Sequence, residues 1–467
     1  MVALMTVTFV LVYFVTGPMR NLLFLPILIL AFRSKNDVLW LAYLFLLINA
    51  PAFFFGRSSA DATFRLPLYQ LASGFSLAIS DMLLFILIYK SYNSWFKENK
   101  LKVTSNIKYI GIYFLIVSLP FTFALGATLA DFVNKLRFIS FYTMVPIFFT
   151  LVNTKEKIYR FAYLIIPFIT IILIDQLHVV AQSAHLVEYF DPGARGVAIN
   201  SETGGIRPIP GGDLIILFAM IMSLFIEKEY YLFKGFKEVV FSIGILSFFI
   251  SATRALLAMG IILFLVDAFL SKNSVKNVVT VVAGAIVVLQ LLVFTELIDR
   301  EMVNASLKRF ELFAKLFQQD TNPYMDSGLD TYDHRLEVEV PKVMYGISHS
   351  PVFGVGLSKY FSKYYNNDLG FHNTILFFGY IGFLLFLGII ASIFLKLNHF
   401  RKTVNSPQVK NQLHVMIAAW AAIMTGYAFT WDFFNFYPSK VMFVSLLLVI
   451  PDLTLLSGSS ENNDVNA

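Results

Sequence analysis

Long runs of apolar residues, separated by short polar segments, repeat along the whole chain. A helix needs about 17 to 25 apolar residues to cross a bilayer, and most of these runs reach or approach that length. They fall at 2–16, 20–32, 37–55, 72–90, 107–128, 136–153, 157–180, 211–227, 237–251, 253–270, 276–296, 372–396, 412–430 and 438–456. The pattern predicts an all-α polytopic membrane protein with about 12 to 14 transmembrane helices. Together they form one predicted transmembrane domain, residues 1–456.

Charges in the polar segments orient this set of helices. If the N-terminus is cytoplasmic, alternate segments collect most of the lysines, including Lys97, Lys234 and Lys402. Membrane proteins keep such an excess of positive charge in their cytoplasmic loops. Both termini are therefore expected in the cytoplasm, and the polar tail 457–467 is expected to be disordered.

Two long segments fall on the opposite, external side. Residues 181–212 contain so many Gly and Pro residues that a regular helix is not expected there. Residues 297–371 form the longer segment, in which we expect a helix after Asp333 that carries Arg335 in its first turn. Both segments are predicted to be loops that face away from the cytoplasm.

Arginine, rather than lysine, is the common cation on this external side. These arginines are Arg20, Arg57, Arg65, Arg137, Arg195, Arg207 and Arg254. Charge alone would orient helices, whereas the planar guanidinium also makes bidentate contacts with phosphate. The bias indicates a phosphate-bearing ligand on this face, with contact to lipid headgroups as the alternative interpretation.

Composition excludes several other classes of protein. Hydrophobic residues make up 57% of the 467-residue chain and charged residues only 14%, a balance far too apolar for an ordinary soluble domain. The net charge of +6 does not indicate nucleic-acid binding, because the lysines lie in loops that connect helices. The lack of cysteine in the sequence excludes disulfides, thiolate catalysis and Cys-ligated metals.

Polar residues and glycines interrupt the apolar sequence in the second half of the chain. In order they are Ser251-Ala252-Thr253-Arg254, Arg335, Pro351, Gly354, Gly356, His372, Asn373, Gly379 and Gly382. The first group marks a junction between helices, and the last two glycines are expected to permit close helix packing. His372 falls in the first turn of a predicted helix, where the helix dipole disfavours the imidazolium and leaves a neutral ring that can accept a hydroxyl proton. Earlier in the chain, Asp175 and His178 indicate a local polar cluster rather than a proton relay.

The order and spacing of these residues over 200–395 resemble the O-antigen ligase and O-antigen polymerase family of bacterial envelope glycosyltransferases. The resemblance implies transfer of a glycan from undecaprenyl pyrophosphate on the periplasmic face of the bacterial inner membrane, without a metal or another cofactor. The acceptor is the lipid A core in ligases and a second lipid-linked glycan in polymerases. The family's important arginines match Arg254 and Arg335, and its important histidine matches His372. Ala252-Thr253 departs from the family, in which Gly-Ser is common.

The residues themselves suit this chemistry. Breaking a sugar–pyrophosphate bond frees a dianionic leaving group, and fixed cations such as Arg254 and Arg335 stabilise the charge that develops on it. Asn373 also suits a helix cap. The other expected contacts with substrate are Arg207, Gly354, Gly356 and Asn373.

A transporter of lipid-linked glycans is the alternative class. It would place charged residues or broken helices at the middle of the bilayer and show internal repeats, whereas here the polar residues gather at one face. Ligase and polymerase share a donor and differ in the acceptor, and the match of three residues favours the ligase. The sequence does not specify the glycan.

Overall fold

The structure is a computed structural model of the chain. It describes residues 1–15, 17–49, 67–72, 75–95, 102–184, 186–189, 197–199, 206–208, 212–251, 254–270, 335–366, 368–429, 432–434 and 437–464. Over these residues the chain is mostly helical, as predicted. It divides into two compact units: Met1–Glu98, Pro146–Gly260 and Lys272–Phe310 form the first, and Asn99–Val145, Ile261–Ser271 and Glu311–Ala467 form the second.

Two helices that are apolar on all sides lie at the centre of the first unit. They are α3 (Asp37–Asn49) and α12 (Asp213–Phe225), and every residue of α12 is buried. A helix without a polar face must be covered on all sides. Here α10 (Lys155–Ile165) contacts both of them, and α13 (Phe236–Ile250) packs along α12.

The remaining helices of this unit surround that centre. They are α1 (Val2–Phe14), α2 (Gly17–Arg33), α5 (Ile79–Trp95), α11 (Phe168–Gln182) and the short turns η4 (Leu186–Tyr189) and η5 (Lys228–Tyr230). Two further helices, α9 (Met144–Leu151) and α14 (Arg254–Leu270), contribute residues to both units. Large apolar side chains of α1 and α2 are exposed, among them Phe14 and Leu30, which is typical of a surface that faces lipid.

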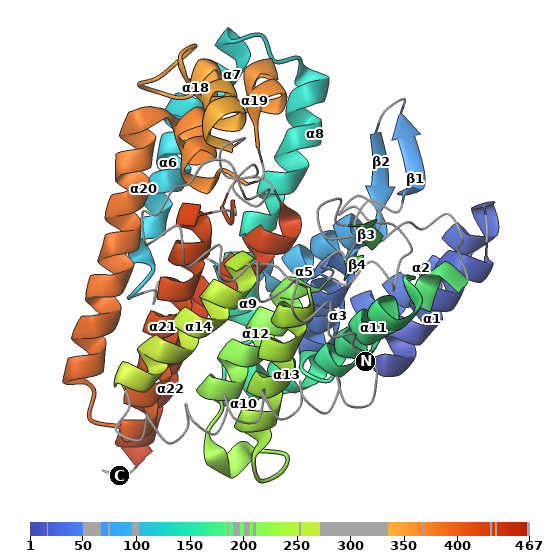
Figure 1. Cartoon of the computed structure of the whole chain (residues 1–467), viewed down its shortest axis with the longest axis vertical. Coiled ribbons are helices and arrows are strands. Elements are labelled where there is room, and N and C mark those ends of the chain that lie inside the picture. The colour runs from blue at the N-terminus through green and yellow to red at the C-terminus, as the bar shows by residue number, and fades with distance from the viewer. Residues whose placement is uncertain are drawn as a thin grey trace, which may run out of the picture. The chain divides into compact units, whose positions relative to one another are not determined.

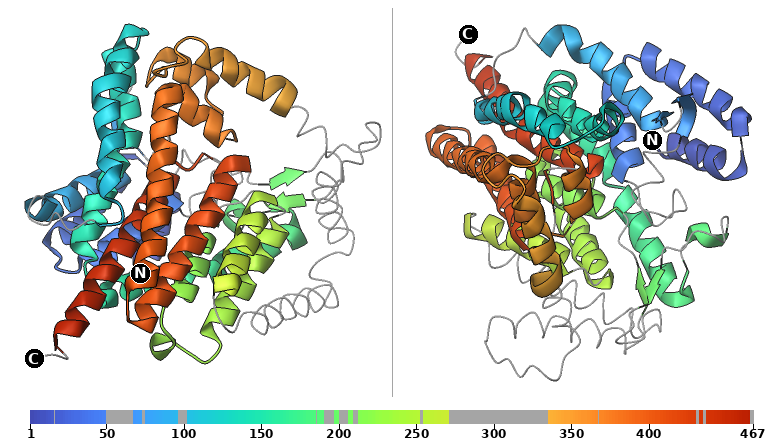
Figure 2. Two further views of the ribbon diagram at one scale, coloured as in Figure 1. Left: turned by 90° about the vertical axis from the view of Figure 1, so that its left-hand side faces the viewer. Right: turned by 90° about the horizontal axis from the view of Figure 1, so that it is seen from above.

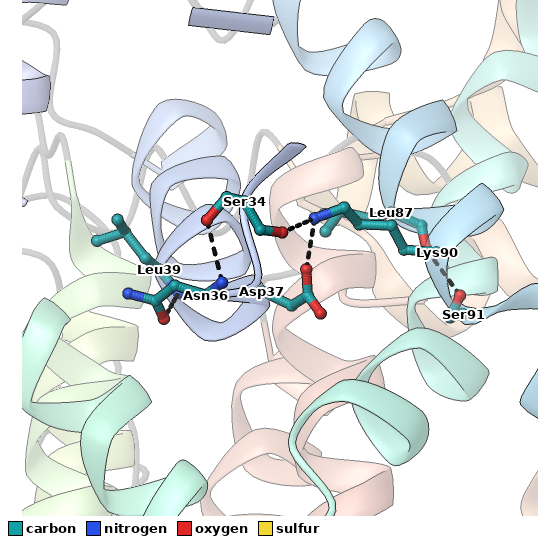
Figure 3. Close-up of polar contacts among 7 residues, drawn as sticks. All are labelled: Ser34, Asn36, Asp37, Leu39, Leu87, Lys90 and Ser91. Atoms are coloured by element: carbon teal, nitrogen blue, oxygen red, sulfur yellow. Dashed lines mark hydrogen bonds and ion pairs between the residues drawn. The ribbon is translucent and has the colours of Figure 1, made fainter. Parts of the chain in front are cut away.

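A polar corner fixes the connection between α2 and α3 (Figure 3). The ammonium group of Lys90 on α5 donates hydrogen bonds to the carbonyl oxygen of Ser34 and to Asp37 Oδ1, the latter at 2.6 Å. The backbone N–H of Asn36 donates to Ser34 Oγ at 3.0 Å. This corner lies in a segment that the lysine pattern predicts to be cytoplasmic.

Two small hairpins accompany the helices, and the described residues remain mostly helical, in agreement with the predicted all-α class. Strands β1 (Pro67–Ala72) and β2 (Phe75–Ala78) pair antiparallel, and so do β3 (Val197–Ile199) and β4 (Ile206–Pro208). The first hairpin occupies the start of the predicted helix 72–90, which in the structure begins at Ile79. A short apolar stretch such as 75–78 is compatible with a strand as well as with a helix, so composition alone does not separate the two.

The second unit is organised along one long helix, α20 (Gly370–Thr403). Figures 1 and 2 show α18 and α19 beside the N-terminal end of α20, with α6 along it. The other elements of the unit are η1 (Ser105–Ile107), α6 (Lys108–Tyr113), η2 (Phe114–Ser118), α7 (Leu119–Ala124), α8 (Leu129–Ile139), η3 (Ser140–Thr143), η6 (Arg335–Glu339), α18 (Val340–Ile347), α19 (Lys359–Tyr364), α21 (Pro407–Phe429) and α22 (Pro438–Asp464).

Four helices of the described residues are long and apolar enough to cross a membrane. They are Ser105–Ala124, Lys155–Gln182, Gly370–Thr403 and Pro438–Leu456, judged by length and composition. Shorter apolar helices fall within the predicted spans 2–16, 37–55, 136–153, 211–227 and 253–270, while 276–296 lies outside the described residues. The predicted span 136–153 is divided among α8, η3 and α9. The helix α22 is described as far as Asp464 and so extends into the segment 457–467 that was expected to be disordered.

Candidate functional site

The first turn of α20 contains the predicted site residues His372 and Asn373. The helix begins at Gly370, two residues before its predicted start. Asn373 is fully buried; its Oδ1 accepts a hydrogen bond from the backbone N–H of Asn366 at 3.1 Å, and its Nδ2 donates to the Asn366 carbonyl. Asn373 therefore fastens the preceding loop to the helix instead of capping the helix N-terminus. Its contact with substrate stays a prediction.

His372 differs from its neighbours in this turn. It is partly buried, and in the part of the chain that the structure describes it makes no hydrogen bond. Phe371 packs edge-on against Tyr427 of α21, with ring centroids 4.7 Å apart, and the hydroxyl of Thr374 is hydrogen-bonded to the Tyr427 hydroxyl. The turn is thus fixed through residues on both sides of His372, while the imidazole nitrogens are not used by these contacts.

A break divides α20 at Gly379. This residue has φ 70° and ψ 179°, a conformation that glycine adopts and other residues rarely do. In a continuous helix the N–H of Tyr380 would bond to the carbonyl of Leu376, and the N–H of Ile381 to the carbonyl of Phe377. Both of these helix bonds are replaced by bonds to another segment.

That segment is 351–358, which we name the splint. Its first two carbonyls accept hydrogen bonds from the two N–H groups just after the break, at 2.8 and 3.2 Å. Its amides at Val355 and Gly356 donate to the carbonyls of Leu376 and Phe377 ahead of the break, at 2.8 and 3.1 Å. The splint therefore satisfies backbone groups that would otherwise lack partners inside an apolar helix.

Glycine is required where the splint meets the break. A Cβ on Gly354 would lie 2.3 Å from the carbonyl oxygen of Phe377, and a Cβ on Gly379 would lie 2.3 Å from that of Val352. Gly356, also at positive φ, leaves no room beside Thr122, whose Oγ1 would be 2.3 Å from a Cβ. Close backbone approach thus explains all three glycines, and the contact of Gly354 and Gly356 with substrate stays a prediction.

Gly379 and Gly382, two of the glycines of α20, have different roles. Gly379 was expected to permit helix packing, and this is wrong, because it ends one helical segment and begins another. Gly382 does allow close packing: a Cβ there would lie 2.7 Å from the ring of Tyr113 on α6. The partner of Gly379 lies 25 positions away, at Gly354, so local sequence around α20 gave no sign of the break.

Arg335 begins the helical segment that precedes the splint in sequence. A helix starts at Arg335, as predicted, and continues into α18, which packs on α20. One apolar cluster joins α18, the splint, α19 and the start of α20. Its buried members are Val343, Ile347, Val355, Leu357, Phe361, Tyr364, Leu369, Leu376 and Phe377. The elements that carry Arg335, Gly354 and His372 therefore share a core.

Arg207 and Arg254 belong to the first unit. Arg207 lies in β4, opposite Ala198 of β3. The predicted helix junction is confirmed, since α13 ends at Ile250 and α14 begins at Arg254. Ser251 is fully buried between them, and its hydroxyl donates to the carbonyl of Phe248 at 3.0 Å. The predicted site residues thus come from both units.

Buried polar side chains gather where α21 ends and α22 begins. Tyr427 and Asp432 are fully buried, and Lys440 is nearly so, with its ammonium 4.8 Å from the ring centroid of Tyr437. Burial, together with the nearby carboxylate of Asp432, raises the pKa of Tyr365 well above its ordinary value. Because Phe371 and Thr374 contact Tyr427, this cluster adjoins the turn that carries His372.

Sequence reasoning did not single out this cluster. Asp432 and Lys440 were a usable signal, because charges so close to two apolar helices must be paired or serve a function. Tyr365 and Tyr427 gave no such signal, since the chain has 22 tyrosines and tyrosine is common at membrane interfaces.

The predicted polar cluster at the end of α11 is confirmed. His178 Nδ1 lies 2.8 Å from the carbonyl oxygen of Ala184, and its Nε2 lies 3.1 Å from the Tyr189 hydroxyl. Asp175 Oδ1 accepts a hydrogen bond from the N–H of Leu186 at 3.0 Å. These contacts fasten η4 to α11.

Comparison with known proteins adds no relative. The chain matches no known family model, and no curated protein is significantly similar to it in sequence. Within the described residues, no group of three or more His, Asp or Glu side chains could hold a metal ion. The functional interpretation therefore rests on the residues and on the resemblance stated above.

Proposed function

We propose that the chain is an integral-membrane glycosyltransferase that moves a glycan from undecaprenyl pyrophosphate to an acceptor, in the manner of O-antigen ligases. The observation that carries the proposal is His372: a partly buried histidine, without a hydrogen bond to the described residues, in the first turn of a membrane-length helix. Fixed neighbours on both sides hold that turn still, which is what a positioned general base needs.

The proposed reaction assigns a role to each cation and to the base. His372 accepts the proton of the acceptor hydroxyl, while the oxygen of that hydroxyl attacks the anomeric carbon of the donor sugar. The bond from that carbon to the pyrophosphate oxygen breaks, and Arg254 and Arg335 stabilise the charge on the departing pyrophosphate. Arg207 is proposed as a weaker third phosphate contact.

The distribution of polar groups in the second unit supports a site on the external face. Residues predicted to be cytoplasmic meet at one end, where Lys396 donates to Ser105 Oγ at 2.8 Å and Asn106 donates to Ser392 Oγ at 2.8 Å. Residues predicted to be external, including His372, lie at the other end of α20. We therefore propose the periplasmic side of a bacterial inner membrane as the location of the site.

A lipid-linked glycan transporter is the second candidate, because α20 is interrupted as transporter helices often are. In transporters the groups freed by such a break bind the cargo. Here the splint bonds the two carbonyls before the break and the two N–H groups after it. This use of the broken backbone favours the enzyme.

The test is transfer by purified protein from a synthetic undecaprenyl-pyrophosphate glycan, with a lipid A core acceptor and a second lipid-linked glycan offered in parallel. Arg335→Ala and Arg254→Ala should each lower the rate by about 10²-fold or more, because each removes a fixed cation from the leaving group. Lysine at either position should restore activity only in part, since it offers a point charge in place of a planar fork.

Arg401→Ala is the matched control, because Arg401 lies at the opposite end of the second unit and contacts His414 at 3.0 Å. The acceptor that is elongated separates ligase from polymerase. Transfer should continue in EDTA, since the arginines take the role of a divalent cation. Full activity of both alanine variants, or movement of the glycan across a vesicle membrane without transfer, would contradict the proposal.

A further inference from the structure

The end of the splint is held by side chains from α7 and α8. Thr122 Oγ1 accepts a hydrogen bond from the N–H of Leu357 at 2.9 Å and donates to the carbonyl of Ser118 at 2.7 Å. The ammonium of Lys135 donates to the carbonyls of Leu357 and Ser358, at 2.8 and 2.9 Å. Both backbone polar groups of Leu357 are thus bonded to side chains from outside the splint.

These bonds continue into α20. Val355 and Gly356, immediately before Leu357, donate to the carbonyls of Leu376 and Phe377, close to the break. A chain of hydrogen bonds therefore runs from Lys135 and Thr122 through the splint to the short helical segment that carries His372. Two of the helix bonds that would tie this segment, 370–378, to the rest of α20 are replaced by bonds to the splint.

We propose that Thr122 and Lys135 are positioning residues for His372. They fix the splint, and the splint fixes the angle at which 370–378 leaves the rest of α20. The value of this positioning for catalysis rests on the proposed function, whereas the mechanical coupling does not. A general base must lie within hydrogen-bond reach of its proton, so a small rotation of this segment lowers the rate without removing any contact with substrate.

Direct contact with the donor is the competing role for Lys135. A lysine on the external side could bind a phosphate, as the arginines are proposed to do. In the structure, however, its ammonium is already engaged by two carbonyl oxygens, and Thr122 holds the same residue of the splint without any charge. Because an uncharged threonine and a lysine hold the same residue of the splint, we assign both to positioning and not to phosphate binding.

The first measurement does not depend on activity. Lys135→Met and Thr122→Val should each speed hydrogen exchange of the amides at 355–357 by about 10-fold or more, because each removes a hydrogen bond that keeps the splint closed. The chain has no native cysteine, so His372→Cys provides a single reactive thiol in the full-length protein. Its labelling by a methanethiosulfonate should accelerate in both backgrounds.

Kinetics then separate positioning from binding. With the synthetic lipid-pyrophosphate donor, Lys135→Met and Thr122→Val should lower kcat by about 10-fold while leaving the KM for donor nearly unchanged, as expected when only the base is misplaced. Lys135→Arg and Thr122→Ser should restore most of the loss. Lys363→Met is the control, because this exposed lysine lies over the Tyr364 ring at 5.2 Å and outside the splint.

Several results would overturn the proposal. Unchanged exchange in both variants, with unchanged labelling of the thiol introduced by His372→Cys, would show that the bonds do not hold the splint. Faster exchange with a normal kcat would show that the splint does not position the base, and a raised KM with a normal kcat would assign Lys135 to the donor. If wild-type protein transfers no glycan, the proposed function fails, and exchange and labelling still decide the coupling.

Discussion

The two ends of the second unit use their polar residues in opposite ways. The lysine pattern predicts that the end where α20 ends and α6 begins is cytoplasmic, and we call it the inner end. There the carboxylate of Asp452 accepts hydrogen bonds from the N–H groups of Lys102, Val103 and Thr104 at 2.6, 2.7 and 3.1 Å. The Thr104 hydroxyl adds a fourth bond at 2.7 Å. At the outer end, where α20 begins, His372 is bonded to none of the described residues.

This difference separates structural polar groups from candidates for chemistry. A buried carboxylate that accepts from four donors has a structural role, because its lone pairs are fully used and its removal would leave those donors without partners. A partly buried imidazole that the fold leaves unbonded costs stability unless water or a substrate occupies it. The outer end also contains the glycine contacts and the splint, so its irregular backbone is built around the turn that carries His372.

The largest expected effect lies in the glycine contact of the outer end. Gly354→Ala places a Cβ 2.3 Å from the carbonyl oxygen of Phe377, at a residue with φ of 80°. The strain at positive φ and the overlap together should lower the free energy of unfolding by about 3 to 5 kcal/mol, which would prevent accumulation of folded protein. Thermal unfolding in detergent and the yield of monodisperse protein measure this.

Gly388→Ala, in α20 beyond the break, is the control. Nothing lies within 4 Å of a Cβ at Gly388, so the alanine should be neutral or stabilise the helix by up to about 1 kcal/mol. If Gly354→Ala were as stable as Gly388→Ala, the splint would not be packed against the break as described.

The extent of α20 was easier to predict from sequence than the contacts that hold its outer end. Apolar runs predict the start of α20 to within two residues, because a lipid-facing or buried helix must be apolar over its length. They place its end at 396, whereas the helix continues to Thr403. At about 1.5 Å per residue, 34 residues span about 50 Å, so the last turns extend beyond the bilayer core, where polar residues are compatible with a helix.

The outer end depends on contacts between distant residues. Gly354 and Gly379 were both visible as glycines, but their shared reason is a contact between two segments, which periodicity does not report. Lys135 likewise reads as an external lysine, although its ammonium bonds to the splint. Residue types thus indicated His372 and Arg335, and only the fold shows what holds the turn in place.

The second-largest effect is expected at His372, and it tests whether the outer end takes part in the reaction. His372→Ala should reduce turnover by about 10²- to 10⁴-fold if the ring accepts the acceptor's proton, the range expected for loss of a general base. Stability should change little, because the described residues make no hydrogen bond to this side chain. The rate is measured in single-turnover transfer from the lipid-pyrophosphate donor.

His399→Ala on the same helix provides the contrast. His399 lies near the inner end, in the last turns of α20, and the alanine should leave turnover unchanged. Equal turnover by the two variants, whether both are normal or both reduced, would contradict the proposed difference in function between the two ends.

The smallest effect is expected at the inner end. Asp452→Asn keeps the shape of the side chain but replaces one oxygen with an NH₂ group, and in either orientation that group faces an N–H donor of 102–104. The free energy of unfolding should fall by about 1.5 to 3 kcal/mol, the contribution of a hydrogen bond to a charged group. Thr104→Val, which removes only the hydroxyl bond, should lower the free energy of unfolding by less.

Because these hydrogen bonds to Asp452 lie at the opposite end of α20 from His372, transfer per folded molecule should stay at the wild-type rate in both variants. A lower rate with unchanged thermal stability would mean that the inner end takes part in function and not only in the fold.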